Sequence, residues 1–399
     1  MDLFFDREHL VLRSHIRSWA EKNLFARAMK EADIDEEALR LANQLGQQGF
    51  MAYVAPKKFG GARDNVQARD LCVLREELAR ASPLADTMFA IQALGSYPIT
   101  IAGSHQQKGR YLSRMAKGEA IAAFALTEPQ AGSDISSMQT RAVRRGKIYH
   151  LTGMKSFISN AGLAHAYVVF ARTDPEKKAK GISAFVVEAE SPGFVVKEKT
   201  HLLSPHPIGV IAFEDCRVPE SQLLGSEGEG LKIALTTLDT LRCTVGAAAV
   251  GFAQRALEEA MRYSESRRQF GRELAQFQAI QFKLAEMATE LEASKLLVYQ
   301  AAWIHDHGQK GLKQKSSMAK LFATEAAQRI VDQALQIHGG MGVVAGTAVE
   351  ELYRAVRALR IYEGTSEIQK LVIARTLLEK SAMEDGGRKV PRGPRPSSG

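Results

Sequence analysis

The chain has 399 residues, of which 45% are hydrophobic and 25% are charged, a composition that excludes a disordered, collagen-like or disulfide-stapled protein. The length exceeds what one hydrophobic core usually supports, so we expect two or three subdomains. The formal net charge is +8, but four basic residues fall in the acid-free tail 386–399. Both signs are mixed elsewhere, so we expect no nucleic-acid partner. No apolar run of about 18 residues is free of charge, so we expect no membrane insertion.

The N-terminus and the cysteines bear on the compartment. Asp2 and Glu8 lie in an N-terminal segment that lacks the charged and apolar regions of a signal or transit peptide, so we expect a cytoplasmic protein or a mature chain that has already been processed. Cys72, Cys216 and Cys243 are far apart and form no CxxC pair. We therefore expect three reduced thiols, with neither a disulfide nor a metal site.

The first part of the chain, residues 1–120, predicts helices. Apolar residues recur there at helical spacing within charged segments. The residues that set this spacing are Phe4, Leu10, Leu12, Ile16, Leu71, Leu74 and Leu78. We therefore expect an N-terminal helical domain.

The middle part, residues 121–230, predicts a β domain. Short β-branched or aromatic runs alternate there with Gly, Pro, Asp and Lys clusters, which is typical of strands and turns. The stretch from Val143 to Gly153 predicts a hairpin with Gly146 in its turn. The other expected strands are 166–173, 182–189, 193–200 and 209–218.

The last part, residues 231–382, predicts long antiparallel helices. It is rich in Ala, Leu, Glu, Gln and Arg, and glycine clusters near 308–311 and 339–342 separate the helices. The tail 383–399 is rich in Gly, Pro and Arg, so we expect it to be flexible. The fold class is therefore α+β and mostly α. No strand–helix–strand alternation or G-x-G-x-x-G loop occurs, which argues against a Rossmann fold.

Two segments of the β domain carry groups that could contact a ligand. LTEPQAGSD at 126–134 follows an expected strand, and Thr127, Ser133 and its backbone N–H groups could approach a bound molecule. A polar surface turn would have the same composition. GMKSFISNAG at 153–162 contains Phe157, which could stack on a planar ring or equally pack in the core.

Two segments of the helical part could also carry chemistry. Three arginines cluster in SRRQFGREL at 266–274, where guanidinium groups could bind phosphate oxygens or cover a charged helix face. In RIYEGTSEIQ at 360–369, Glu363 is followed at once by Gly364. The carboxylate could act as a base beside a closely approaching backbone, or it could be a glutamate near a helix end.

In this order and at these intervals, the motifs resemble those of the acyl-CoA dehydrogenase family over about residues 4–380. The family patterns LTEP-x-AGSD, G-x-K-x-[FW]-I-[ST]-N, R-x-x-FG…Q, Q-x-x-GG and YEGT are met by LTEPQAGSD, GMKSFISN, RRQFGRELAQFQ, QIHGG and YEGT. The resemblance implies an N-terminal helical domain, a central β domain and a C-terminal four-helix bundle. It also implies FAD between the last two, and a homo-oligomer, in most members a tetramer.

The resemblance assigns residues to FAD. Phe157 would stack on the isoalloxazine, and Ser159 would hydrogen-bond near its reactive nitrogen. Arg267, Gln269 and Gln278 would reach the pyrophosphate and adenosine across the subunit boundary. The other residues assigned to the cofactor are Phe124, Leu126, Thr127, Gln336, Gly339, Gly340, Thr365 and Glu367.

The implied reaction is α,β-dehydrogenation of an acyl-CoA thioester to the trans-2-enoyl-CoA. Glu363 would remove the α-proton while the β-hydrogen leaves as hydride to FAD, and the electrons would pass to an electron-transferring flavoprotein. Some family branches carry the base before the arginine of an LDxxR-like segment, but Leu241 holds that position here. Residues at positions that contact the CoA thioester are Ser133, Asp239, Arg242 and Gly364.

Alternatives and departures stay open beside this interpretation. An acyl-CoA oxidase shares the fold and the base but passes electrons to oxygen, and a non-catalytic flavin-fold binding protein would keep the fold alone. The family commonly has Arg-Asp where this chain has Arg354 and Ala355, so a charge partner is expected to be missing. The segment 204–209 (SPHPIG) replaces a Gly/Ser/Asp/Thr-rich stretch and introduces His206. Residues 89–99 would line the acyl cavity and lack Arg and Lys, which predicts uncharged acyl groups.

Overall fold

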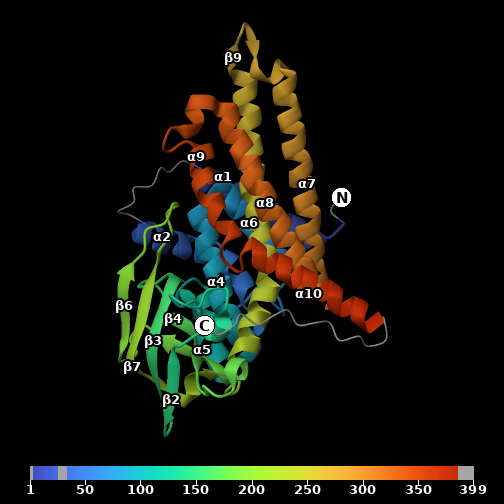
Figure 1. Ribbon diagram of the computed structural model, residues 1–399. Coiled ribbons are helices and arrows are strands. Elements are labelled where there is room, and N and C mark those ends of the chain that lie inside the picture. The colour runs from blue at the N-terminus through green and yellow to red at the C-terminus, as the bar shows by residue number, and fades with distance from the viewer. Residues whose placement is uncertain (1–2, 26–33, 385–399) are drawn as a thin grey trace.

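The computed structural model describes residues 3–25 and 34–384, and Figure 1 shows a helical layer, a twisted sheet and a long helical bundle. This order confirms the α+β, mostly α, fold class. The C-terminal helix continues through Glu384, slightly past the expected start of the tail at 383. The remainder of the expected basic tail lies outside the described residues.

Helices of both helical parts surround α3, which is buried on all sides. It packs against α1 and α4 and against two helices of the C-terminal part, α6 (Gly230–Ser266) and α7 (Gln278–Asp306), so Leu71, Leu74 and Leu78 are inaccessible, as expected. Leu10 does not share the buried face of α1, because it is 41% exposed. The helices are α1 (Arg7–Asn23), α2 (Ile34–Gln47), α3 (Ala68–Ala81), α4 (Pro83–Ala102) and α5 (His105–Ala116).

The central part of the chain forms one mainly antiparallel sheet. Its order is β6-β7-β3-β2-β4-β5-β8, and β1 pairs with β4 in parallel. Gly146 has a φ of +63° in the turn between β2 and β3, as the sequence predicts for this hairpin. The strands are β1 (Ala122–Ala125), β2 (Arg141–Arg145), β3 (Ile148–Ser159), β4 (Ala166–Arg172), β5 (Ile182–Glu188), β6 (Phe194–Lys199), β7 (Ile208–Pro219) and β8 (Leu223–Leu224).

The C-terminal helices form the bundle. α6, α7 and α8 pack against one another, and α10 packs across α8. A short hairpin of β9 (Arg268–Gln269) and β10 (Arg272–Glu273) joins α6 to α7 at the end remote from the sheet (Figure 1). The helices are α6 (Gly230–Ser266), α7 (Gln278–Asp306), α8 (Leu312–His338), α9 (Ala348–Val356) and α10 (Ser366–Glu384).

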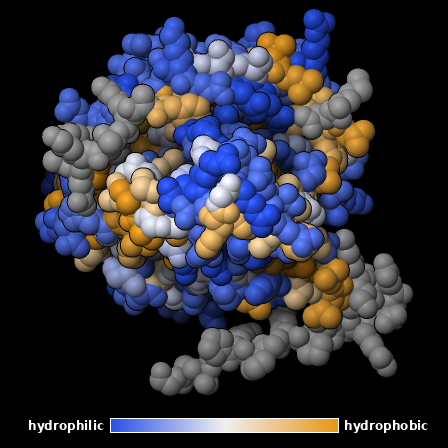
Figure 2. Space-filling view, turned by 90° about the horizontal axis from the view of Figure 1, so that it is seen from above, coloured by the Kyte–Doolittle hydropathy of each residue, from blue (hydrophilic) through white to orange (hydrophobic). Residues whose placement is uncertain are grey.

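Burial explains the apolar sequence of the longest helix. α6 is long and apolar enough, by length and composition, to cross a membrane, but 83% of its most apolar window is buried inside the protein. The face in Figure 2 is mostly hydrophilic, with apolar residues in small scattered groups. All three cysteines are free and buried.

Candidate active site

Glu363 lies in a strained loop between two helical segments. It follows the short helix η9 (Arg357–Arg360) and precedes α10, with a φ of +51°, and Gly364 has a φ of +90°. A left-handed backbone is costly for a residue with a side chain, so surrounding contacts must hold it. Lys320 Nζ donates to the Gly364 carbonyl at 2.8 Å, and Gln369 Nε2 donates to the same oxygen at 2.9 Å. Side chains of α8 and α10 therefore fix this loop.

The Glu363 carboxylate is enclosed and partly unpaired. Its Oε2 atom is buried and has no hydrogen-bond partner among the described residues. Burial raises the pKa of Glu363, and the charges of Arg75, Lys320 and Arg242 counteract part of that rise. A desolvated carboxylate with a free oxygen and a raised pKa has the properties of a general base.

The three cations near Glu363 come from separate parts of the chain. Arg75 on α3 donates to both carboxylate oxygens of Asp86, at 2.8 and 2.9 Å, in a buried pair. Arg242 on α6 pairs with Asp239 at 2.6 Å. Burial lowers the pKa of Lys320 to about 8. Each arginine forms its ion pair with another carboxylate, and the charges of both still counteract part of the rise in the pKa of Glu363.

Sequence reasoning missed Arg75 and Lys320. Arg75 sits among alternating charges that are typical of a solvated helix face, and Lys320 lies in an ordinary Ala-rich helix. The only available signal was that α3 carries apolar residues on more than one face, which indicates a helix buried all round.

A buried ion pair shapes the loop after β1. Lys155 Nζ lies 2.8 Å from Glu128 Oε1, and both side chains are inaccessible. Glu128 also accepts the backbone N–H groups of Gln139 and Thr140. The carbonyl of Thr127 accepts the N–H of Ser156 at 3.0 Å. These buried contacts fix the LTEPQAGSD loop, so it is not a loose surface turn, although Ser133 itself is exposed.

Phe157 and Ser159 lie at the end of β3, where both side chains are accessible to solvent. Phe157 is 60% exposed and has a φ of +53°, whereas the next residue, Ile158, is buried. Phe157 is therefore not a core residue, and its ring is free to pack against a planar molecule. Ser159 is partly exposed, and its Oγ lies 2.8 Å from Nε2 of His206. Phe124 and Leu126 belong to β1 and the residue after it.

The remaining candidate residues for FAD do not lie beside Phe157 and Ser159 of the same chain. Arg267, Gln269 and Gln278 are exposed around the β9–β10 hairpin, at the opposite end of the molecule from the sheet (Figure 1). Gly339 and Gly340 lie beyond the end of α8, and a Cβ added to either would meet no atom within 4 Å. Gln336, in the last turn of α8, and Glu367, in the first turn of α10, are exposed, and the Thr365 hydroxyl accepts the Ile368 N–H.

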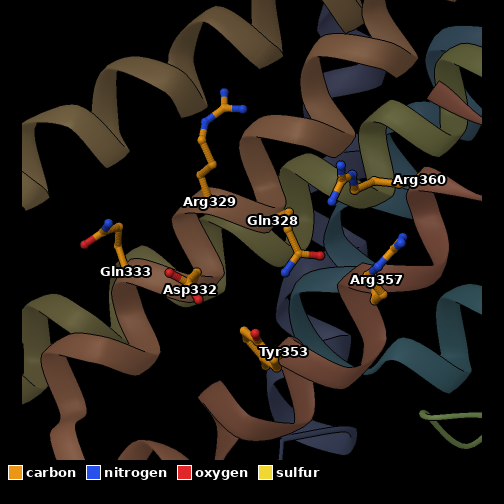
Figure 3. Close-up of a pocket in the computed structure, with 7 residues that line it drawn as sticks. All are labelled: Gln328, Arg329, Asp332, Gln333, Tyr353, Arg357 and Arg360. Atoms are coloured by element: carbon orange, nitrogen blue, oxygen red, sulfur yellow. The ribbon is translucent and has the colours of Figure 1, made fainter. Parts of the chain in front are cut away.

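A separate pocket lies between α8, α9 and η9. It has a volume of about 420 Å³, and Figure 3 shows three arginines from two of these elements among the residues around it. Arg360 also pairs with Glu325 at 2.8 Å. None of the seven lining residues is a candidate from the sequence. The lining residues are Gln328, Arg329, Asp332, Gln333, Tyr353, Arg357 and Arg360.

Comparison with known proteins agrees with the three-part fold. Models of the N-terminal, middle and C-terminal domains of acyl-CoA dehydrogenases match residues 6–119, 123–216 and 228–378. The chain belongs to the acyl-CoA dehydrogenase family. Members of this family are FAD-dependent oxidoreductases, which confirms the enzyme class and the cofactor.

Individual relatives cover nearly the whole chain. The 3-(aryl)acrylate reductase of Clostridium sporogenes is 42% identical over 94% of this chain and 100% of its own. The CarC subunit of the caffeyl-CoA reductase–Etf complex of Acetobacterium woodii is 38% identical over 95% of this chain and 100% of its own. The structure of butyryl-CoA dehydrogenase from Megasphaera elsdenii has a TM-score of 0.88 and 34% identity, over 95% of this chain and 100% of that one.

The residues present fit the family cofactor. A flavin dinucleotide can stack on the exposed ring of Phe157, hydrogen-bond to the partly exposed hydroxyl of Ser159 and approach the backbone of Gly339 and Gly340 closely. One expectation is wrong: Arg354 does not lack a charge partner, because Glu350 one turn earlier in α9 pairs with it at 2.6 Å. Replacement of the usual aspartate by Ala355 therefore leaves this arginine paired.

Proposed function

We propose that this acyl-CoA dehydrogenase family member converts an acyl-CoA thioester into the trans-2-enoyl-CoA. The observation that carries the proposal is Glu363, a half-buried residue whose inaccessible Oε2 atom has no partner among the described residues, in a left-handed loop held from two helices. FAD, when bound, accepts the β-hydrogen as hydride. Glu363 would take the α-proton, and the backbone N–H of Glu363 would donate to the thioester oxygen, where negative charge develops.

The segment 89–99, which we propose to line the acyl cavity, suits an uncharged acyl group. Phe89, Leu94 and Tyr97 of α4 are buried, and the segment 89–99 carries no cation. Arg75 does not supply one, because Asp86 already occupies its guanidinium. A substrate carboxylate would therefore be desolvated without a partner. Ser133, Asp239, Arg242 and Gly364 are proposed to contact the thioester.

We propose that FAD binding completes a homo-oligomer. Phe157 and Ser159 would face the isoalloxazine of one subunit, while Arg267, Gln269 and Gln278 would reach the FAD of a neighbour. Their position at the end of the bundle remote from the sheet supports this division (Figure 1). Electrons would leave to an electron-transferring flavoprotein, a partner that fits the complex to which the CarC relative belongs.

A second candidate is the reverse reaction, reduction of an enoyl or aryl-acrylyl thioester. It is favoured by the names of two relatives, both reductases. The same base and cofactor serve either direction, since Glu363 as an acid returns the α-proton.

Anaerobic mixing with a series of acyl-CoAs and enoyl-CoAs tests the proposal. Monocarboxylic acyl-CoAs should bleach the bound FAD and yield enoyl-CoA, and an electron-transferring flavoprotein should reoxidise it faster than oxygen. Faster bleaching by glutaryl-CoA than by every monocarboxylic thioester of similar length would contradict the pocket assignment. If oxygen is the faster acceptor, the oxidase alternative holds.

A further inference from the structure

The segment Ser204–Gly209 is fastened beside the end of β3. The Pro207 carbonyl accepts the N–H of Asn160 at 2.7 Å. Ile208 and Gly209 pair with Ser159 and Ile158 in the sheet. Prolines stand on both sides of His206, and each fixes its own φ and restricts the residue before it. The fold therefore holds the imidazole against β3 instead of leaving it on a free loop.

His206 meets Ser159 as a neutral partner. Its Nε2 atom lies 2.8 Å from the Ser159 hydroxyl oxygen. Burial alone lowers the pKa of His206 to about 4, so the ring is uncharged near neutral pH. A neutral imidazole carries one N–H and one acceptor nitrogen, so only one of two arrangements can hold at this contact.

The two arrangements differ in what Ser159 can offer to a flavin. If Ser159 donates to Nε2 of His206, its only hydroxyl hydrogen is used, and the hydroxyl can then offer only its acceptor lone pairs to the flavin. If Nε2–H donates to Ser159, the hydroxyl hydrogen remains free for the exposed side, next to Phe157. The reactive ring nitrogen of an oxidised flavin is an acceptor, so only the second arrangement suits it.

We propose that His206 is a positioning residue for the flavin. The imidazole donates Nε2–H to Ser159 Oγ and thereby turns the Ser159 hydroxyl toward the cofactor. The inference rests on the proposed place of Ser159 beside FAD. It gives the unusual SPHPIG segment a role: it tunes how easily the bound flavin is reduced. Removing the histidine leaves the hydroxyl free to rotate, so oxidised flavin loses an oriented donor and its reduction becomes easier.

A double-mutant cycle on the flavin reduction equilibrium tests this inference. The purified FAD-bound protein, His206→Leu, Ser159→Ala and the double variant are titrated anaerobically against a redox dye. We expect His206→Leu to shift the equilibrium about tenfold toward reduced flavin when Ser159 is present, about 30 mV for a two-electron couple. In the Ser159→Ala background the same substitution should change nothing.

Two further variants sharpen the result. His206→Gln keeps an amide donor near the Nε2 position and should stay closer to the parent than His206→Leu does. His201→Leu removes an exposed histidine three residues before this segment and should leave the equilibrium unchanged. An equal shift in both Ser159 backgrounds, no shift in either, or a shift toward oxidised flavin overturns the inference. Bound FAD and its bleaching by acyl-CoA are measured on the parent first, and they test the proposed function separately.

Discussion

At the scale of single residues, the chemistry depends on how Glu363 is held. A glutamate with a φ of +51° is kept there by hydrogen bonds to the backbone that follows it. Its carboxylate is desolvated, and cations that already have partners lie near it. The carboxylate can therefore ionise, and it remains able to accept a proton because it is not held in a salt bridge with any described residue.

The pH dependence of flavin reduction follows from this environment. Only the ionised carboxylate accepts a proton, so the rate is highest above the pKa of Glu363 and is lost as the pH falls through it. Because burial raises that pKa, we expect the midpoint to lie above the ordinary value of a glutamate. Anaerobic stopped-flow reduction over a pH series measures it. A rate that is flat, or that increases on acidification, would contradict the assignment.

The position of Leu241 offers a rescue at the same scale. Leu241 is buried next to Arg242, at the position where some family branches carry their base. Placing a carboxylate there in a Glu363→Gln background should restore part of the lost rate of flavin reduction. The comparison is between Glu363→Gln and Glu363→Gln/Leu241→Glu under anaerobic acyl-CoA. No recovery, with acyl-CoA still bound, would mean that Leu241 does not face the α-carbon.

At the scale of elements, the Glu128–Lys155 pair holds the loop after β1 against β3. Breaking a fully buried pair leaves an uncompensated charge, which costs about 3–5 kcal/mol. We expect Lys155→Met or Glu128→Gln alone to lower the free energy of unfolding by that order, and the double variant to lose less than the sum. Urea denaturation measures it.

The exposed pair of Lys197 and Glu214 provides the matched control. These side chains are 44% and 58% exposed, and exposed pairs contribute about 0–1 kcal/mol. Lys197→Met should therefore barely move the urea midpoint. Equal losses for Lys155→Met and Lys197→Met would show that burial of the first pair is energetically unimportant.

Elements were predictable from the sequence where periodicity decides them. The strands at Ala166–Arg172 and Ile182–Glu188 and the hairpin around Gly146 follow from local pattern and turn chemistry. The burial of Arg75 was not predictable, because alternating charges usually cover a solvated helix face. Its ion pair with Asp86 forms in the interior only because other helices enclose α3. The exposure of Phe157 likewise depends on its left-handed backbone at the end of β3, which residue spacing does not reveal.

At the scale of the whole molecule, cofactor binding and assembly are linked in the proposal. We expect about one FAD per chain and at least a dimer, most simply a tetramer, in light scattering. Arg267→Ala should lower FAD occupancy, since a charge-assisted hydrogen bond contributes about 1.5–3 kcal/mol.

Arg262 is the control for this loss. It is exposed near the end of α6, the helix that ends just before Arg267, and it pairs with Glu259, so Arg262→Ala should keep the parent's FAD content. A monomer that holds FAD and turns over acyl-CoA would contradict the shared site. So would an Arg267→Ala variant with unchanged FAD affinity.

The most direct test of the account is the rate at which an acyl-CoA reduces the bound flavin in Glu363→Gln, measured by anaerobic stopped flow beside the parent. Removing a positioned base costs about 10²–10⁴-fold in rate, so we expect at least a hundredfold slower bleaching with FAD content and acyl-CoA binding retained. Glu176→Gln, in an exposed loop between β4 and β5, should bleach at the parent rate. Bleaching of Glu363→Gln at the parent rate would show that Glu363 is not the base.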